Sequence, residues 1–371
     1  MQRLPRIDAW GLMIIVIAGL LLACTSERSI ESNGEERSFV YVSIQQDTVV
    51  TIIFDADADT IIDSIRIPEW IGAPYVYADP RRPVVALTTA ELRMFRGAEP
   101  LPQSIDYYRF AGLGFIEDPD WIVASVSGCL PGGGRTAAYN ATDLSQVYSD
   151  TLGLLNAQVC EEQGLLFGIS SPCDPAEGPI FSLFASYDYG NRRVVETWSI
   201  DPDSSGRPPS LWRFRVHPDG RRLYVTTSTR QSHVLVCYDL RERVIIWRQP
   251  IVATLGEPRV TPDGKEVWYP DPGWGTPDPY DLVETVTVFD ADNGTVLSEI
   301  SLKDYRVGGE VPVTPRVVRF LPSGKKAYVL GAFNNPGPLL IIDVPSREVI
   351  KSFWQEDWRW LFDMDLGPAV D

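Results

Sequence analysis

The second half of the chain repeats a six-residue pattern, Arg-x-x-Pro-Asp/Ser-Gly, three times. The copies are RVHPDG at Arg215–Gly220, RVTPDG at Arg259–Gly264 and RFLPSG at Arg319–Gly324. Each copy precedes a basic residue, an aromatic-rich apolar segment and a further apolar run that ends at Asp239, Asp290 or Asp343. Pro-Asp-Gly between two apolar runs is typical of a tight turn. Recurrence of this strand-and-turn unit predicts a repeat architecture.

The same unit extends over the rest of the chain, although the first half departs from the Pro-Asp-Gly turn. Short runs rich in Val, Ile, Tyr and Phe alternate with 30 prolines and 29 glycines, so we expect an all-β protein. Four-strand units are predicted over residues 71–110, 112–153, 154–200, 211–251, 256–302 and 314–354. Residues 38–68 hold three strands, and residues 360–368 supply the missing one. We therefore predict a seven-bladed β-propeller of four-stranded antiparallel blades, in which the C-terminal strand joins the N-terminal blade and closes the ring. A count of six blades stays open.

The N-terminus is typical of an export signal. Arg3 and Arg6 precede an apolar stretch too short for a comfortable membrane span. The stretch ends in Leu-Leu-Ala-Cys at Cys24, which resembles the lipobox of bacterial lipoproteins. The resemblance implies cleavage before Cys24, so that residues 1–23 are a signal peptide, and lipid attachment to Cys24. Residues 24–37 are polar after the cysteine and have no apolar periodicity, so we expect a flexible tether, and the repeated units place one propeller domain over residues 38–371. An ordinary signal peptide that carries a cysteine is the alternative.

The resemblance also implies a location. Thr25, rather than aspartate, follows the cysteine, and by analogy with lipoproteins this favours the outer membrane. We expect a lipid-anchored protein of the bacterial cell envelope, periplasmic or surface-exposed, that contacts the membrane through its lipid anchor alone.

The repeat segments resemble the YVTN-repeat family of bacterial surface β-propellers. The residues that carry the resemblance are HPDGRRLYVTT, TPDGKEVWYPD and LPSGKKAYVLG with their downstream aspartates. The match is good over residues 211–354 and loose over residues 38–200. Members of the family are mostly described as surface or envelope binding proteins. Related propellers include a lactonase group and the heavy subunits of quinoprotein amine dehydrogenases.

Charge and composition exclude several classes of function. The formal net charge is −17, and no basic stripe offsets it, so DNA, RNA and anionic lipid are excluded as main partners. The chain has two histidines and no Cys-x-x-Cys, which argues against a histidine-rich metal centre, a c-type haem and a zinc site. We therefore predict no metal and no cofactor.

Export permits disulfides. Cys129 and Cys173 each follow a predicted strand, in what we interpret as the same loop of adjacent units, and we predict that they pair. Cys237 lies in an apolar strand and is predicted to be a buried thiol.

Three other motifs favour structural interpretations. The run Asp55–Asp63 resembles a calcium loop, but Thr60 and Arg66 stand where an EF-hand needs glycine and glutamate. Asp55 instead aligns with the turn aspartates of the later units. His217 is replaced by threonine and leucine in the other repeat copies, which indicates local packing. The glycines at 132–134 precede no helix, which favours a loop over a phosphate cradle.

The first residue of the repeat is the sharper candidate for function. Arg215, Arg259 and Arg319 lie on the predicted innermost strand, so they should point into the central channel and form an anion-binding site. The alternative is that each arginine pairs with a carboxylate of a neighbouring blade and serves packing. The weaker units place Tyr77, Ile116 and Asp365 at roughly the equivalent position.

A second candidate is a recognition face built around the long loop at residues 270–284. Aromatic side chains beside carboxylates suit a sugar, a cationic peptide or a protein partner, although tryptophans that fill gaps between blades would give the same pattern. The candidate residues are Trp70, Trp274, Asp278, Tyr280 and Trp358.

Three hypotheses of function follow. The first is a non-catalytic scaffold, expected to be monomeric, that binds a protein or small-molecule ligand in the envelope; no Gly-x-Ser-x-Gly motif or legible Ser-His-Asp set argues for catalysis. The second is a lactonase-like hydrolase of a small anionic substrate, with Asp365 or Glu117 as base. The third is a structural subunit of an envelope redox complex whose partner carries the cofactor.

Overall fold

The computed structural model describes most of the chain after its N-terminal segment. The described residues are 37–45, 49–67, 75–88, 91–106, 112–126, 134–170, 173–174, 178–179, 183–200, 210–228, 232–254, 256–271, 283–308, 312–331, 337–356, 358 and 360–369. Clustering of contacts divides the chain into Met1–Glu36 and Arg37–Asp371. The predicted signal peptide, Cys24 and the tether up to residue 36 lie outside the described residues.

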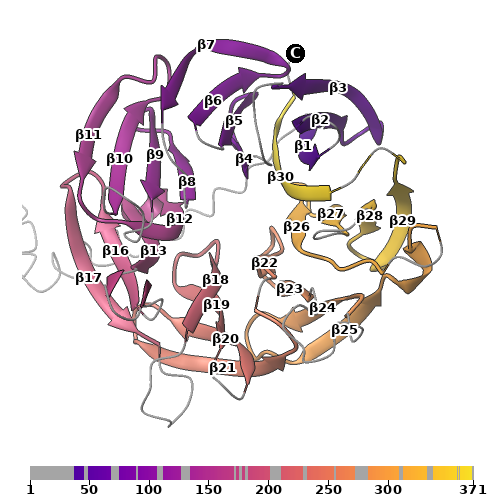
Figure 1. Ribbon diagram of the computed structural model, residues 1–371. Coiled ribbons are helices and arrows are strands. Elements are labelled where there is room, and N and C mark those ends of the chain that lie inside the picture. The colour runs from indigo at the N-terminus through magenta and orange to yellow at the C-terminus, as the bar shows by residue number, and fades with distance from the viewer. Residues whose placement is uncertain are drawn as a thin grey trace, which may run out of the picture. The chain divides into compact units, whose positions relative to one another are not determined.

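Seven four-stranded antiparallel sheets make up the blades of a propeller (Figure 1), as the repeat predicted. In six of the sheets the strands follow chain order from the centre outwards, whereas in the first the last strand of the chain, β30, lies innermost and β1, β2 and β3 follow. The first four blades contain β30 (Trp360–Pro368), β1 (Ser38–Gln45), β2 (Val49–Asp55) and β3 (Thr60–Arg66); β4 (Tyr75–Ala78), β5 (Val84–Thr88), β6 (Glu91–Arg96) and β7 (Glu99–Asp106); β8 (Gly112–Ile116), β9 (Trp121–Val126), β10 (Arg135–Asn140) and β11 (Gln146–Asp150); and β12 (Leu154–Cys160), β13 (Leu165–Ser170), β16 (Leu183–Asp188) and β17 (Arg193–Ser199).

The remaining three blades contain the clear repeat copies. They are β18 (Ser210–Val216), β19 (Arg222–Ser228), β20 (His233–Asp239) and β21 (Val244–Ile251); β22 (Arg259–Val260), β23 (Glu266–Asp271), β24 (Thr285–Asp290) and β25 (Val296–Ser301); and β26 (Val317–Phe320), β27 (Lys326–Leu330), β28 (Leu339–Asp343) and β29 (Glu348–Phe353). A ribbon of β14 (Cys173–Asp174) and β15 (Gly178–Pro179) and two short 3-10 helices, η1 (Glu161–Gln163) and η2 (Lys303–Tyr305), complete the described elements. None of the described helices is long and apolar enough to cross a membrane.

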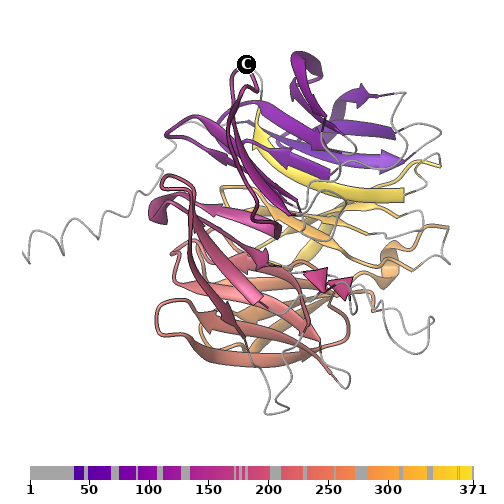
Figure 2. The same ribbon diagram turned by 60° about the vertical axis from the view of Figure 1, so that its left-hand side comes forward.

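The ring closes through the last strand of the chain. β30 pairs antiparallel with β1 from Ser38 opposite Pro368 to Gln45 opposite Trp360, and Figure 2 shows the yellow strand beside the indigo strands of the N-terminal segment. The prediction that residues 360–368 complete the first blade is therefore confirmed. Closure pairs β1 on both sides, so the strand presents no free edge to another chain.

Turn chemistry explains why glycine and aspartate recur at fixed places in the repeat copies. Gly220, Gly264 and Gly324 have φ values of +67°, +75° and +68°, a conformation that costs glycine little. At the end of the third strand, an aspartate accepts backbone hydrogen bonds from the turn that follows. The Asp55 carboxylate takes them from the N–H groups of Asp57 (2.9 Å) and Ala58 (3.0 Å), so the structural interpretation of Asp55 is confirmed. Among the described residues, no His, Cys, Asp and Glu cluster could hold a metal ion.

The buried apolar side chains lie between neighbouring blades and do not form a single central core. In the described residues, seven clusters of buried apolar side chains each join two neighbouring blades. The closing interface is one of them and combines Val40 and Phe54 of the first blade with Tyr328 and Ile341 of the seventh. Each blade is therefore stabilised by its neighbours, as burial of one sheet face requires.

Candidate functional site

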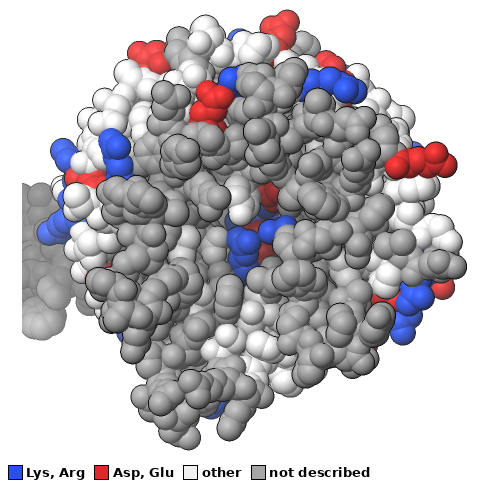
Figure 3. All heavy atoms as spheres, viewed as in Figure 1, with Lys and Arg blue, Asp and Glu red and all other residues white. Residues whose placement is uncertain are grey.

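The innermost strands surround the axis of the ring. These strands are β30, β4, β8, β12, β18, β22 and β26 (Figure 1). Charged atoms of both signs are visible at the centre of the face shown in Figure 3. The repeat arginines lie on three adjacent innermost strands, β18, β22 and β26, and their charges influence one another. The structure therefore brings Arg215, Arg259 and Arg319 into one region, although the binding of an anion there stays a prediction.

Arg319 is the best paired of the three. Its Nε donates to Asp365 Oδ1 at 2.9 Å, Nη1 lies 3.5 Å from Glu257 Oε2, and Nη2 lies 3.8 Å from Asp363 Oδ1. Asp365 and Asp363 belong to the next blade and Glu257 to the preceding one. Burial lowers the pKa of Arg319, but these carboxylates outweigh it and raise the pKa overall. This arginine fits the packing alternative, in which a guanidinium joins neighbouring blades.

Arg259 is only partly compensated. Its Nη2 lies 3.0 Å from Glu257 Oε1. The side chain is 7% exposed, and its Nε is buried without a hydrogen-bond partner in the described part of the chain. Burial, together with the charges of Arg215 and Arg319, holds the pKa of Arg259 well below its usual range. An unpaired donor on a buried cation is costly, so a further acceptor at Nε would stabilise the arrangement.

Arg215 has no counter-ion in contact. None of the ion pairs or hydrogen bonds among the described residues involves its guanidinium, although the side chain is half-buried. Burial lowers its pKa, and Arg319 lowers it further, whereas Glu257 and Asp365 act in the opposite direction from a distance. Of the three repeat arginines, Arg215 is therefore the one whose guanidinium is free to bind a ligand.

Glu257 is the central carboxylate of the cluster, and sequence reasoning missed it. Burial alone raises its pKa, but Arg259, Arg319, Arg215 and Arg213 lower it to about 2. The carboxylate is thus ionised at any physiological pH. Its position two residues before Arg259, just ahead of β22, is the signal that could have revealed it.

A second layer of charges lies along the same strands. Arg213 stands two residues before Arg215, and Asp363 two residues before Asp365, as the alternation of an extended strand requires. Arg213 Nη1 donates to Asn156 Oδ1 at 2.8 Å. Burial lowers the pKa of Arg316, and Arg213 lowers it further while Asp363 raises it, so these groups share one environment. The full cluster is Arg213, Arg215, Arg259, Arg316, Arg319, Glu257, Asp363 and Asp365. Five of these side chains are arginines and three are carboxylates.

Two carboxylates of the cluster also fasten the closing strand. Asp363 Oδ2 accepts a hydrogen bond from the Val76 N–H at 3.1 Å, and Asp365 Oδ2 accepts one from the Ala78 N–H at 3.0 Å. Both donors belong to β4, the innermost strand of the next blade. Gln158 of β12 plays a similar part toward β18, since its Oε1 accepts from the Val216 N–H at 3.2 Å. Ring closure and the charges of the channel therefore depend on the same side chains.

The equivalent positions on the weaker units differ from the expectation in part. Tyr77 is half-buried, and the charges of Asp363 and Glu257 raise its pKa after burial does, which places it near the cluster. Asp365 is part of the cluster, as expected. Ile116 is 1% exposed and packs into the apolar interface between the third and fourth blades, so its assignment to the channel is wrong. Its neighbours on both blades are apolar, which explains the burial.

The other predicted site residues lie elsewhere. Trp358 is 1% exposed, sits in the closing interface and donates from Nε1 to Gln355 Oε1 at 3.1 Å, so its assignment to an exposed recognition face is wrong. It fills a gap between blades, as the packing alternative allowed. The remaining members of that face lie outside the described residues: Trp70, Trp274, Asp278 and Tyr280.

Of the two predictions about cysteines, the described residues test only the one on Cys237. Cys129 lies outside the described residues, and so does the side chain of Cys173, so their pairing stays a prediction. Cys237 is a fully buried free thiol, as predicted, and burial raises its pKa to about 12.

Glu117, one of the two bases considered for a hydrolase, does not join the arginine cluster. Its Oε2 lies 3.3 Å from Arg81 Nη1, and the same nitrogen lies 2.8 Å from Glu161 Oε1. Asp365, the other base, is held by Arg319 and the Ala78 N–H. Neither carboxylate therefore resembles a free general base beside the arginines.

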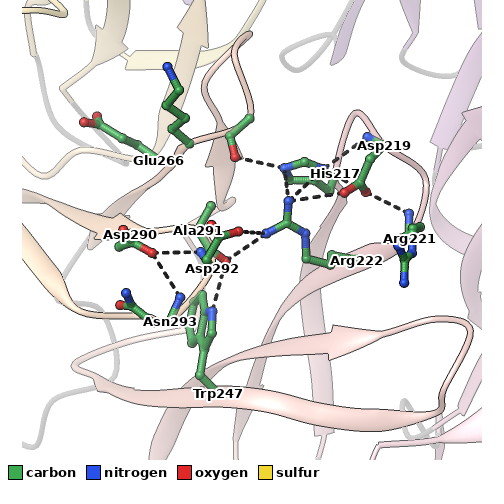
Figure 4. Close-up of polar contacts among 12 residues, drawn as sticks. His217, Asp219, Arg221, Arg222, Trp247, Glu266, Asp290, Ala291, Asp292 and Asn293 are labelled. Atoms are coloured by element: carbon green, nitrogen blue, oxygen red, sulfur yellow. Dashed lines mark hydrogen bonds and ion pairs between the residues drawn. The ribbon is translucent and has the colours of Figure 1, made fainter. Parts of the chain in front are cut away.

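His217 has a structural role at the interface of the fifth and sixth blades (Figure 4). It is 6% exposed, and its Nε2 lies 2.9 Å from Gly264 O and 2.8 Å from Arg222 Nη2. Arg222 continues across the interface to Ala291 O at 3.3 Å, which also accepts from Trp247 Nε1 at 3.1 Å. The prediction of local packing for His217 is confirmed.

A tyrosine hydroxyl joins neighbouring blades at two interfaces, one of which is the interface where the ring closes. Tyr224 donates its hydroxyl to Ala291 O at 3.1 Å between the fifth and sixth blades. Tyr328 donates to Ala56 O at 3.2 Å between the seventh and first blades. Both acceptors follow the turn aspartate of the third strand, so in these two repeat copies the tyrosine joins its blade to a turn of the next one. The aromatic residue of the repeat is thus explained by packing, unlike Arg215.

Comparison with known proteins supports the fold. No protein-family model and no curated protein matched the chain. Among solved structures, a hypothetical selenium-binding protein from Sulfolobus tokodaii is 12% identical, with a TM-score of 0.65 over 91% of this chain and 94% of that one. Hydrazine synthase from Kuenenia stuttgartiensis is 14% identical, with a TM-score of 0.57 over 83% and 90%. Dihydro-heme d1 dehydrogenase NirN, solved in complex with DHE, is 14% identical, with a TM-score of 0.54 over 88% and 74%. Identities this low show a shared propeller fold alone.

Proposed function

We propose that this chain is a non-catalytic binding protein of the bacterial cell envelope that captures an anionic small molecule in its central channel. The observation that carries the proposal is Arg215, a half-buried residue whose guanidinium forms no ion pair with any described residue. It is joined by Arg259, whose Nε has no hydrogen-bond partner in the described part of the chain and whose pKa the charge of Arg215 lowers. Guanidinium groups bind carboxylate and phosphate through paired hydrogen bonds. Several guanidinium groups gathered in one region of a chain of net charge −17 favour the binding of an anion there.

Binding is favoured over catalysis because the cluster offers no free base. Asp365 and Glu117, the two candidates for a hydrolase, are both engaged in ion pairs. The similarity to hydrazine synthase and NirN keeps a structural subunit of a redox complex as the alternative. A haem-containing or other redox partner co-purified from membranes would favour that alternative.

The experiment uses the mature chain without its signal peptide and an anion panel that includes phosphate, sulfate, oxalate and citrate. Isothermal titration measures binding to the wild type, to Arg215→Gln and to the control Arg241→Gln, whose side chain is 77% exposed. Loss of one charged hydrogen-bonding group lowers affinity by about 10- to 100-fold. The control should bind like the wild type. No binding of any anion to the wild type, or equal binding by Arg215→Gln, would contradict the proposal.

We also propose that Cys24 carries the lipid that holds the propeller at the outer membrane. The support is the Leu-Leu-Ala-Cys sequence at the end of the apolar stretch and Thr25 after it. The test compares the wild type with Cys24→Ala by labelling with a radioactive fatty acid and by membrane fractionation. Label and sedimentation with outer membranes are expected for the wild type only. Equal labelling of both chains would refute lipid attachment at this position.

A further inference from the structure

β12 and β18 are neighbouring innermost strands (Figure 1), and each contains a β-bulge. In β12, Asn156 and Ala157 together lie opposite one residue of β13. In β18, Trp212 and Arg213 together lie opposite Thr226. A bulge re-aims the side chains of its strand, and bulges are common beside functional sites. The two bulges are joined, because Arg213 Nη1 donates to Asn156 Oδ1 at 2.8 Å.

The bulge in β12 holds Asn156 in an unusual backbone conformation. Its φ is +52°, in the left-handed region that residues other than glycine seldom adopt. The other described non-glycine residues with positive φ lie in or beside turns, whereas Asn156 lies inside a strand. Strained backbone of this kind persists only where the surroundings hold it, and it gathers at binding and catalytic sites. In this protein, the strained residue is the one that holds Arg213.

The bulge in β18 is fixed by a buried hydroxyl. A bulged residue lacks a regular partner in the sheet, and Thr226, which is 0% exposed, supplies one. Thr226 Oγ1 accepts a hydrogen bond from the Arg213 N–H at 3.0 Å and lies 3.0 Å from Thr254 O, to which it donates. The backbone and the guanidinium of Arg213 are therefore both held by neutral groups.

Arg213 has no counter-ion among the described residues. Its half-buried side chain uses Nη1 for Asn156, and its Nε and Nη2 form no hydrogen bond within the described part of the chain. Two residues of extended strand span at most roughly 7 Å, so the backbone of Arg213 lies that close to Arg215. The charge of Arg213 also helps to lower the pKa of Glu257, which contacts Arg259 at 3.0 Å. Arg213 therefore acts on the same region as the two arginines of the proposed anion site.

We infer that Arg213 is a further ligand-binding residue of the anion site and that Asn156 is its positioning residue. This inference rests on the proposed anion-binding function. Nε and Nη2 of Arg213 bind the anion, while Nη1 stays on Asn156. A neutral acceptor holds the guanidinium without neutralising it, whereas a carboxylate in the same place would compete with the ligand. A side chain held in advance also loses less conformational entropy when the anion binds.

The test is isothermal titration of the wild type and of two variants with phosphate, sulfate, oxalate and citrate. Asn156→Asp keeps the shape of the side chain and its hydrogen bond to Arg213 but adds a counter-ion. It should bind the tightest of the four anions about 10- to 100-fold more weakly, because the carboxylate competes for the guanidinium. Its Tm should not fall, since a charged hydrogen bond replaces a neutral one. The control Asn293→Asp adds the same charge at an exposed turn between β24 and β25 and should bind like the wild type.

Arg213→Lys separates direct contact from a long-range effect of charge. Lysine keeps the positive charge but lacks the planar fork of N–H donors, so direct contact predicts a loss of affinity of about tenfold. Wild-type affinity in either variant, while Arg215→Gln is still impaired, overturns the inference and leaves the anion site standing. Binding of none of the four anions by the wild type overturns the proposed function itself.

Discussion

Replacement of Glu257 by glutamine should strengthen anion binding while it destabilises the protein. Glu257 contacts Arg259 at 3.0 Å and Arg319 at 3.5 Å, so it occupies part of the cationic site as an internal counter-ion. A ligand beside Arg215 at an assumed roughly 7 Å from Glu257 feels a repulsion of about 2 kcal/mol at an effective dielectric constant of about 20. Removal of this repulsion tightens binding by up to about 30-fold.

The cost in stability follows from the pKa of Glu257. Its value falls from 4.5 to about 2 on folding, which corresponds to about 3 kcal/mol of stabilisation at neutral pH. Because the folded pKa is the lower one, this stabilisation is complete above the unfolded value and is lost as the pH falls from about 5 toward 2. With an unfolding entropy of about 2.1 cal/mol/K per residue, Glu257→Gln should lower Tm by about 4 °C at pH 7.

Thermal unfolding with and without anion measures both effects in one assay. The variant should have the lower Tm without ligand, the larger rise in Tm at saturating ligand, and a weaker pH dependence between pH 5 and 2 than the wild type. Glu242→Gln, at a side chain that is 64% exposed, is the matched control and should change neither value. If the variant binds the anion no better than the wild type, Glu257 is not a competitor for the site, and the placement of the anion at Arg215 and Arg259 is refuted.

Two other predictions concern stability. Burial raises the pKa of Asp363 above the ordinary value of 3.8. Ionisation of Asp363 in the folded protein therefore costs stability as the pH rises above that value. Asp363→Asn should raise Tm at pH 8 in thermal unfolding, and a lower Tm would contradict this. Gly264→Ala and Gly324→Ala both force alanine into a positive φ, but a Cβ at position 264 would lie 2.9 Å from His217 Nε2, whereas the nearest atom at position 324 is 3.9 Å away. In urea titration, Gly324→Ala should cost about 1 kcal/mol and Gly264→Ala about 1–2 kcal/mol more; equal losses would show that the histidine moves aside.

Much of the fold could be predicted because turn chemistry and hydrophobic alternation are local. The Pro-Asp-Gly turns and the strand-ending aspartates mark blade after blade, and the three-strand start with the one-strand end left closure as the consistent topology. The less regular units of the first half could also be divided into four-stranded blades, because their apolar strands keep a similar spacing. The burial of Trp358 could not be predicted in this way. Whether a tryptophan in a linker points to solvent or between blades depends on contacts with a blade that is distant in sequence.

The candidate site was predictable only in part for the same reason. Arg215, Arg259 and Arg319 stood out because the repeat aligns them. Glu257, which bridges two of them, belongs to no repeated pattern, and Asp363 lies on a strand that reaches the site only through closure. Partners that come from different blades cannot be read from sequence spacing, although the two-residue step between Arg213 and Arg215 is typical of one side of a strand.

Closure by the last strand has a consequence for biosynthesis. Since the inner edge of β1 lacks a partner until residues 360–368 emerge, the N-terminal blade stays exposed at one edge while the six later blades are synthesised. Those nine residues also bring Asp363 and Asp365 to the arginines. A chain truncated before them would lack both the closed ring and these two partners of Arg319, so the proposed anion binding should be confined to full-length molecules, and a shortened chain would keep its first blade open.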